Sequence, residues 1–324
     1  MSTLAVAGRG DLLFAAAELI ERDGDKVSRR VMSADALGIA PPELLDRLGR
    51  RRDPFAGLAL ERPLIVGVVN ITPDSFSDGG RYLAPDAAIA HALRLEAEGA
   101  DILDIGAEST RPGAAPVDLQ EELRRVMPVI EALVPKVRAR LSIDTRKAEV
   151  MQRAARAGAA LINDVSALTH DPGALQVAAE TGLPVVLMHA QGDPRTMQDD
   201  PRYADVVLDV YDWLAARIDA CERAGIPRSR LIVDPGIGFG KTLAHNLALL
   251  GALSIFHGLG CPILLGASRK SFIGKLTGAA VADRLPGSIA AALLGVQQGV
   301  QILRVHDVAA TRQALAVWEG AQGA

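Results

Sequence analysis

The sequence predicts an α/β fold, a (β/α)8 TIM barrel at residues 64–324 that follows an N-terminal extension at residues 1–63. One sequence pattern recurs in residues 64–324: a stretch with helical periodicity, then a glycine, then a short strand that ends in polar residues. A glycine at this point suits the left-handed residue that closes a helix. Short runs of Val, Ile and Leu that are apolar on both faces are typical of buried parallel strands. A chain of 324 residues fits one barrel of about 250 residues plus an extension better than two equal domains.

The recurring pattern gives the positions of the expected strands. They are predicted at residues 64–69, 102–105, 141–144, 161–164, 184–188, 231–234, 262–265 and 302–305. The segments between them have helical periodicity, for example Leu119 to Val137 and Tyr203 to Ala224. Strands that alternate with helices in this way form either a barrel or a doubly wound open sheet. The barrel is favoured because every strand ends in a polar cluster, whereas an open sheet normally concentrates its site at one switch point.

The extension follows a different pattern. Leu12 to Ile20 and Val27 to Val31 predict a β-hairpin around an Asp-Gly turn, although the Ala15–Glu18 core also permits a helix. Pro41 to Leu48 predicts a helix. Arg50–Arg52, which Pro54 follows closely, are expected to form a solvated linker rather than a binding patch. No chemistry is predicted for this part of the chain.

Composition excludes several classes of protein. Hydrophobic residues make up 49% of the chain and charged residues 23%, which is enough apolar material for a large core and excludes a disordered chain. The net charge of −4 gives no reason to expect nucleic acid or a membrane as a partner. Cys221 and Cys261 match neither a disulfide framework nor a zinc pattern. With no signal peptide and no apolar run of about 18 residues, a soluble cytoplasmic protein is expected.

Polar side chains at the strand ends predict a site for a flat heterocycle. Asp144, Asn163 and Asp234 end or nearly end three of the predicted strands. Strand ends meet at the mouth of a barrel, so these groups are expected to converge there. A buried carboxylate needs hydrogen-bond donors. An aminopyrimidinone ring, with adjacent N–H and NH2 donors, is a suitable partner.

Cationic side chains near other strand ends predict a phosphate site. Arg111, Lys270, Arg304 and His306 come from the loops after the second, seventh and eighth strands, and barrels often bind phosphate groups near their last strands. Asn70 is a candidate ligand of Mg2+, because this ion prefers few protein oxygens together with substrate phosphates. A heterocycle site beside a diphosphate site implies transfer chemistry in which pyrophosphate leaves.

Other polar residues near the mouth have structural explanations as well. Asp104 and Asp164 either line the site or cap the turns that follow them. Arg146 either binds a ligand or forms a structural ion pair. Glu108 either belongs to the site or only orients its own loop. His189 is either functional or a satisfied core residue. Three further histidines are expected at surface or packing positions: His91, His170 and His257.

Familiar catalytic motifs are absent from the sequence. The run from Gly236 to Thr242 looks like a nucleotide-binding loop, but a Walker A motif requires glycine where Pro235 stands. A dinucleotide fingerprint requires glycine where Leu243 stands. No zinc-protease, C-x-x-C or nucleophile-elbow motif occurs. Zinc hydrolase, redox and serine hydrolase functions therefore lose their support.

The motifs together resemble those of dihydropteroate synthases. Asn70–Gly80 resembles the first signature of this family and Asp104–Gly113 the second. Shorter motifs follow in family order at Ser142–Thr145, Ile162–Val165, Leu187–His189, Asp234–Lys241, Ser268–Ser271 and Arg304–Asp307. The resemblance extends from about Leu64 to the C-terminus. Ala190, where many members have methionine, is a mild departure.

The resemblance implies a role for each matching residue. The pterin would be bound by Asp144, Asn163, Met188, Asp234 and Lys270. The diphosphate would be bound by Thr110, Arg111, Arg304 and His306. The p-aminobenzoate pocket, which sulfonamides would also occupy, would consist of Phe76, Pro112, Phe239, Lys270 and Ser271. The catalytic residues would be Asp144, Asp234, Lys270, Arg304 and His306. Asn70 would bind Mg2+, and the protein would be a homodimer.

The implied reaction condenses a pterin diphosphate with p-aminobenzoate and releases pyrophosphate. Two other hypotheses remain open from the sequence. A methyltransferase of the same superfamily would share the pterin acids but would have no need of Arg111, Arg304 and His306. A catalytically silent paralogue would bind a pterin without turnover and would be expected to lose loop or diphosphate residues, which this chain retains.

Overall fold

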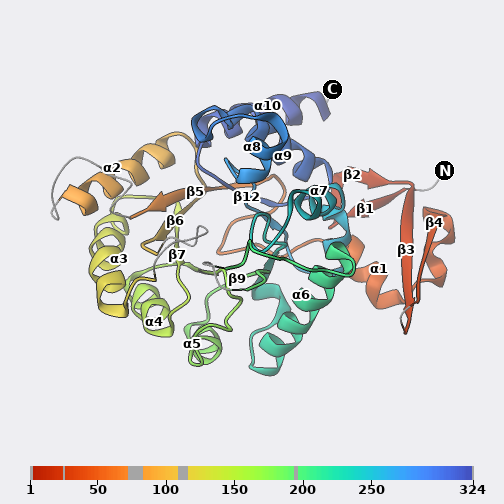
Figure 1. The fold of residues 1–324 in the computed structure, drawn as a ribbon, viewed down its shortest axis with the longest axis horizontal. Coiled ribbons are helices and arrows are strands. Elements are labelled where there is room, and N and C mark those ends of the chain that lie inside the picture. Colours follow the sequence, from red (N-terminus) through yellow and green to blue (C-terminus); the bar gives the residue numbers. More distant parts are fainter. Residues whose placement is uncertain (1–2, 25, 72–82, 109–115, 193–195, 323–324) are drawn as a thin grey trace.

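The computed structural model describes residues 3–24, 26–71, 83–108, 116–192 and 196–322. Its centre is an eight-stranded parallel sheet with the strand order β10-β9-β8-β7-β6-β5-β12-β11 (Figure 1). The strands are β5 (Leu64–Asn70), β6 (Ile102–Gly106), β7 (Arg140–Asp144), β8 (Leu161–Asp164), β9 (Val185–Met188), β10 (Leu231–Asp234), β11 (Leu264–Leu265) and β12 (Ile302–Val305). A parallel bridge between Val233 and Ile263 joins the two ends of this order. The predicted barrel is confirmed, and the open sheet is excluded.

Helices alternate with the strands and surround them (Figure 1). They are α2 (Leu83–Ala97), α3 (Leu119–Leu133), α4 (Ala148–Ala157), α5 (Ala174–Thr181), α6 (Val206–Arg223), α7 (Leu243–Gly251), α8 (Ser271–Thr277), α9 (Leu285–Gln297) and α10 (Val308–Gln322). Gly158 closes α4 in a left-handed conformation with φ of 110°, as the recurring glycine predicted. Among the helices in the described part of the chain, none is both long and apolar enough to cross a membrane.

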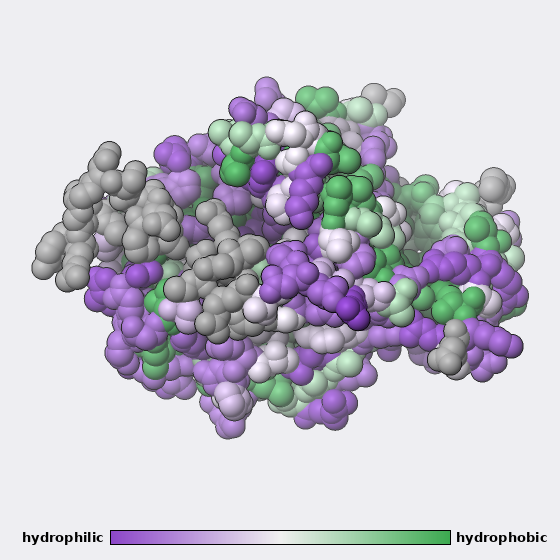
Figure 2. Space-filling model, in the orientation of Figure 1, coloured by the Kyte–Doolittle hydropathy of each residue, from purple (hydrophilic) through white to green (hydrophobic). Residues whose placement is uncertain are grey.

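Alternation along the strands divides the apolar residues into two layers. Residues such as Ile65, Leu103 and Ile143 face outward and form the large core between strands and helices. Their neighbours face inward and form a second cluster inside the barrel: Leu64, Val66, Ile102, Leu161, Val186, Ile232, Leu264 and Ile302. On the face in Figure 2, hydrophilic residues cover much of the rim, and hydrophobic residues show in separate patches.

The extension, at the red end of the ribbon in Figure 1, contains two hairpins, a 3-10 helix (Ala34–Ile39) and one α-helix. Antiparallel pairs join β1 (Leu4–Val6) with β2 (Arg9–Phe14) and β3 (Ala16–Asp23) with β4 (Lys26–Ser33). The predicted hairpin is confirmed, and the alternative helix is excluded. Its first strand begins only at Ala16, because the residues before it pair with β1 instead. The helix expected at Pro41 is α1 (Pro42–Gly49).

The segment after α1 differs from the predicted solvated linker. Arg50 and Arg51 are exposed, as expected, but Arg52 is buried. Its guanidinium group donates hydrogen bonds to backbone oxygens at the end of α1 and to the carbonyl of His257. Phe55 and Leu60 then join the apolar cluster inside the barrel. The prediction failed because Arg52 satisfies its donors on carbonyls that only the folded chain brings together. The domain boundary at residue 64 stays a prediction.

Candidate functional site

A polar layer lies directly above the apolar cluster inside the barrel. Side chains two residues apart on a strand share a face, so each inward-facing apolar residue has a successor nearer the carboxyl end of its strand. The successors of Ile102, Leu161, Val186, Ile232 and Ile302 are Asp104, Asn163, Met188, Asp234 and Arg304. The alternation of the strands therefore places four predicted site residues, Asn163, Met188, Asp234 and Arg304, in one layer at the mouth together with Asp104.

Arg304 links strands that lie far apart in the sequence. Its Nε donates to Asp104 Oδ2 at 2.7 Å, and its Nη2 donates to Asp144 Oδ2 at 2.8 Å. Asn163 Nδ2 donates to the same oxygen of Asp104 at 2.9 Å. Burial and the nearby charge of Asp104 raise the pKa of Asp144 to about 7, and the Arg304 guanidinium opposes this shift. Arg304, expected on the diphosphate side, thus lies against the acids.

Asp234 and Lys270 converge from neighbouring strands. A Cβ on Gly266 would lie 3.7 Å from both Asp234 Oδ2 and Lys270 Nζ, so both groups lie over this glycine. The Lys270 ammonium donates to the carbonyl of Ile237 at 2.5 Å and lies 4.6 Å from the centre of the Phe239 ring. Burial raises the pKa of Asp234 and lowers the pKa of Lys270 to about 8, and each shift is opposed by the charge of the partner.

The remaining predicted site residues lie around this layer. The Nδ1 atom of His306 lies 3.1 Å from Ser268 Oγ, which also accepts a hydrogen bond from the His306 backbone N–H. Asn70 is the last residue of β5 and is half-buried, and Met188 is the buried last residue of β9. Ser271 is exposed at the start of α8. Four predicted residues lie outside the described part of the chain: Phe76, Thr110, Arg111 and Pro112.

The alternatives left open by the sequence are now decided for several residues. Asp164 caps its own turn, because it accepts hydrogen bonds from Ser166 and Leu168. Asp104 instead lines the site. Arg146 forms a structural ion pair with Glu108 at 2.7 Å.

His189 is a packed core residue. It is buried beside Trp213, with ring centres 5.0 Å apart in an edge-on arrangement. Its Nδ1 accepts a hydrogen bond from Lys241, and burial together with this cation lowers the pKa of His189 to about 3. The histidine is therefore neutral and already has its partner.

The sequence left the role of Asp104 open and indicated none for Lys241, and the structure brings both residues to the site. Asp104 is the shared partner of Arg304 and Asn163, and one of its oxygens is buried without a protein partner among the described residues. Lys241 is 1% exposed and lies beneath the turn that contacts Lys270. The signal for Asp104 was its spacing of two residues from Ile102. The signal for Lys241 was its place at the end of the motif Asp234–Lys241, whose resemblance to the family implied no role for this lysine.

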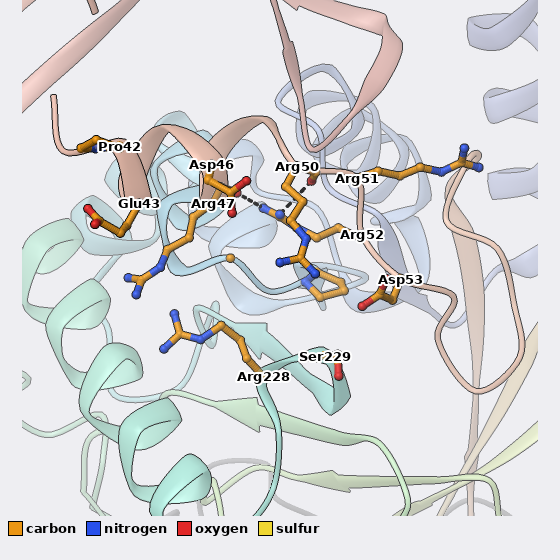
Figure 3. Close-up of a pocket in the computed structure, with 12 residues that line it drawn as sticks. Pro42, Glu43, Asp46, Arg47, Arg50, Arg51, Arg52, Asp53, Arg228 and Ser229 are labelled. Atoms are coloured by element: carbon orange, nitrogen blue, oxygen red, sulfur yellow. Dashed lines mark hydrogen bonds between the residues drawn. The ribbon is translucent and has the colours of Figure 1, made fainter. Parts of the chain in front are cut away.

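A cavity of about 520 Å³ lies at the opposite end of the barrel, between α1 and the segments that precede β10 and β11 (Figure 3). None of the predicted site residues lines it. Three of the five arginines that line it have structural partners: Arg228 pairs with Glu222 at 2.8 Å, Arg51 pairs with Glu61, and Arg52 donates to backbone oxygens. The cavity follows from the packing of α1 on the barrel and is not the candidate site.

The described residues contain no group of three or more His, Cys, Asp or Glu side chains arranged to hold a metal ion. Asn70 offers one amide oxygen at the mouth. A single hard oxygen ligand fits Mg2+ only where a bound substrate supplies further oxygens.

Comparison with known proteins identifies relatives of the whole barrel. Residues 66–306 match the model of the pterin binding enzyme family. The chain is 49% identical over 262 residues to the dihydropteroate synthase of Escherichia coli strain K12, which covers 81% of this chain and 93% of that protein. The structure of Xanthomonas albilineans dihydropteroate synthase with 4-aminobenzoic acid has a TM-score of 0.79 at 54% identity, covering 83% of this chain and 97% of the other. A Yersinia pestis dihydropteroate synthase in a sulfonamide drug complex has a TM-score of 0.78 at 50% identity, covering 82% and 97%.

Proposed function

The chain belongs to the dihydropteroate synthases of the pterin-binding enzyme family, and on this basis we propose how its residues carry out the reaction. It is a transferase of folate biosynthesis that condenses 6-hydroxymethyl-7,8-dihydropterin diphosphate with p-aminobenzoate. The products are 7,8-dihydropteroate and pyrophosphate.

The convergence of Asp144, Asn163 and Asp234 in one buried layer carries the assignment of the pterin site. Oδ1 of Asp234 accepts the Gly236 N–H at 2.7 Å, and in the described part of the chain Oδ2 receives no protein hydrogen bond. A buried carboxylate oxygen needs a donor. The N–H and NH2 groups of the pterin supply such donors in the plane of the ring. Met188 lies in the same layer and offers an apolar surface to the ring.

The bond-breaking step requires stabilisation of opposite charges on the two sides of the pterin methylene. The C–O bond to the diphosphate breaks, its electron pair leaves with pyrophosphate, and positive charge spreads into the pterin. Asp234 and Asp144 stabilise that positive charge, while Arg304 and His306 bind the departing anion. The aniline nitrogen then attacks the carbon and loses a proton. Because the aniline is neutral at pH 7, no strong general base is required.

Arg304 has a second consequence for binding. Its guanidinium donates hydrogen bonds to Asp104 and Asp144. A diphosphate offers stronger bidentate acceptors at the same mouth. Substrate binding therefore redirects Arg304 and releases carboxylate oxygens toward the donors of the pterin. Thr110 and Arg111, proposed to complete the diphosphate site, lie outside the described residues.

Mg2+ is the proposed cofactor. Asn70 would contribute one oxygen, and the diphosphate would contribute others, which fits the preference of this ion. When bound, the ion would neutralise part of the charge that develops on the leaving pyrophosphate.

Phe239, Lys270 and Ser271 form the described part of the proposed p-aminobenzoate pocket, with Phe76 and Pro112 outside the described residues. Sulfonamides are expected to compete there. We further propose a homodimer in the cytoplasm. The free, buried thiols of Cys221 and Cys261 support a reducing compartment.

The decisive experiment is pyrophosphate release by the purified protein with the pterin diphosphate and Mg2+, with and without p-aminobenzoate. Release that requires p-aminobenzoate, and that sulfamethoxazole suppresses competitively, is the expected result. Pterin binding without such release would overturn the proposal and favour the silent paralogue. Methyl transfer from methyltetrahydrofolate to a corrinoid protein would instead identify the methyltransferase.

A further inference from the structure

We propose that Lys241 is a positioning residue that fixes the turn after β10, and through it Lys270, for the binding of p-aminobenzoate. The inference rests on the function proposed above. It concerns a side chain that lies beneath the site and has no open path to the substrates.

Lys241 uses its donors on the chain itself. The side chain is 1% exposed, and its Nζ lies 3.0 Å from His189 Nδ1 and donates to the carbonyl of Phe239 at 3.0 Å. Because His189 is neutral, its Nδ1 can serve as the acceptor of this hydrogen bond. Burying a lysine is costly unless its ammonium is hydrogen-bonded. Burial lowers the pKa of Lys241 to about 7, so the observed contacts, which join the turn to the segment after β9, offset only part of the cost of burying its charge.

The turn needs a side-chain anchor of this kind because it is rich in glycine. Gly236, Gly238 and Gly240 all have positive φ, at 69°, 86° and 61°. A Cβ on Gly236 would lie 1.8 Å from the carbonyl oxygen of His189, so no other residue fits this close approach. Glycine also leaves the backbone more freedom than any other residue. Side-chain hydrogen bonds must therefore select one conformation of the turn.

The same turn also positions Lys270. The carbonyl of Ile237 accepts the Lys270 ammonium, and the Phe239 ring lies against that same ammonium. Both contacts come from the segment that Lys241 ties to His189. A displacement of this segment moves the two groups that set the position of Lys270, and small misplacements in an active site are costly.

Other hydrogen bonds anchor the turn but do not replace this one. Asn246 Oδ1 accepts from the Gly238 N–H at 2.6 Å, and Tyr203 donates to the carbonyl of Gly240 at 2.8 Å. Neither of these reaches the carbonyl of Phe239, which Lys241 alone binds among the described residues. Loss of Lys241 is therefore expected to displace the turn locally without unfolding the barrel.

The test compares Lys241→Met with Lys136→Met, which makes the same change at an exposed lysine before β7, at the opposite end of the barrel. In Lys241→Met, the KM for p-aminobenzoate is expected to rise about tenfold. The KM for the pterin diphosphate is expected to rise less than the KM for p-aminobenzoate, because Asp144 and Asn163 hold the pterin from other strands even where Lys270 and Asp234 move with the turn. Lys136→Met is expected to match the parent protein in both constants.

A double-mutant cycle separates positioning from a general loss of stability. His189→Phe keeps an aromatic ring against Trp213 and removes the side-chain acceptor of Lys241, while the backbone carbonyls of His189 and Phe239 remain as acceptors. If the two residues act through one hydrogen bond, the double variant raises the KM for p-aminobenzoate no more than Lys241→Met alone. Lys241→Gln, which keeps a donor, is expected to give a smaller rise and provides the measurement if Lys241→Met does not fold.

An equal rise in both KM values, an additive double variant, or an unchanged KM for p-aminobenzoate would overturn the positioning role. These outcomes are distinct from failure of the proposed function. If the proposed function were wrong, the parent protein itself would release no pyrophosphate in response to p-aminobenzoate.

Discussion

The two ends of the barrel interior are built on the same strands but have opposite chemistry. At the amino ends, Ile102, Ile232 and Ile302 belong to an apolar cluster that Phe55 and Leu60 of the extension complete. Two residues further along the same strands, the inward positions hold Asp104, Asp234 and Arg304. Because side chains two residues apart on a strand face the same side, both the apolar and the polar side chains point into the barrel. Only their position along the strand separates the layer that stabilises the fold from the layer that forms the site.

The energetic consequence of this difference is that the two layers respond differently to substitution. Burial of apolar side chains at the amino end stabilises the fold by about 25 cal/mol per Å². Burial of carboxylates at the mouth raises their pKa and opposes stability unless each finds a partner. Substitutions at the mouth should therefore reduce activity more than stability, and substitutions at the other end should do the reverse.

The largest effect is expected at the mouth. Asp234→Asn or Lys270→Ala should lower kcat by about a few hundredfold or more, since one preorganised electrostatic group is typically worth about 3–4 kcal/mol in the transition state. Steady-state pyrophosphate release measures this, with thermal unfolding as the check that the variants fold. Near-native turnover in a folded variant would remove that residue from the mechanism.

At the amino end, Phe55→Ala should lower the free energy of unfolding by about 3 kcal/mol, because it leaves a cavity in the cluster that closes the barrel. Turnover at 25 °C should be unchanged. Urea denaturation measures the loss, and Val31→Ala, at a side chain 78% exposed, is the matched control with a change within about 0.5 kcal/mol. A fall in turnover at full stability would show that the two ends are not independent.

Much of the fold follows from local signals in the sequence. Runs such as Leu64 to Val69 are apolar on both faces, and the recurring glycine marks the ends of several helices, so local sequence predicts these strands and helices without knowledge of contacts. The end of α3 at Leu133, short of the expected Val137, shows where periodicity alone is too coarse. The division between β2 and β3 depended on pairing partners, which local sequence does not reveal.

The site was predictable where a residue ends a strand and was missed where its role depends on partners. Asp144 and Asp234 ended predicted strands, so barrel geometry placed them at the mouth. The role of Asp104 depends on Arg304, 200 residues away in sequence, and the role of Lys241 depends on His189. Arg52 was misjudged for the same reason, since its acceptors include a carbonyl 205 residues away.

The pH dependence of stability tests the polar layer more finely. Burial and Asp104 raise the pKa of Asp144 to about 7 in the folded protein, above the ordinary aspartate value of 3.8. A carboxyl group with a raised folded pKa contributes stability that is fully present below its unfolded pKa and is lost as the pH rises through the folded pKa.

The difference in unfolding free energy between the parent protein and Asp144→Asn, which cannot titrate, should therefore decrease as the pH rises from 4 to 7. Between pH 5 and 6 the expected decrease is about 1 kcal/mol, since one pKa unit corresponds to about 1.4 kcal/mol. Urea denaturation of both proteins at each pH provides the measurement. A difference that stays constant over this range would mean that the guanidinium of Arg304 keeps Asp144 ionised, and that burial at the mouth costs this carboxylate little.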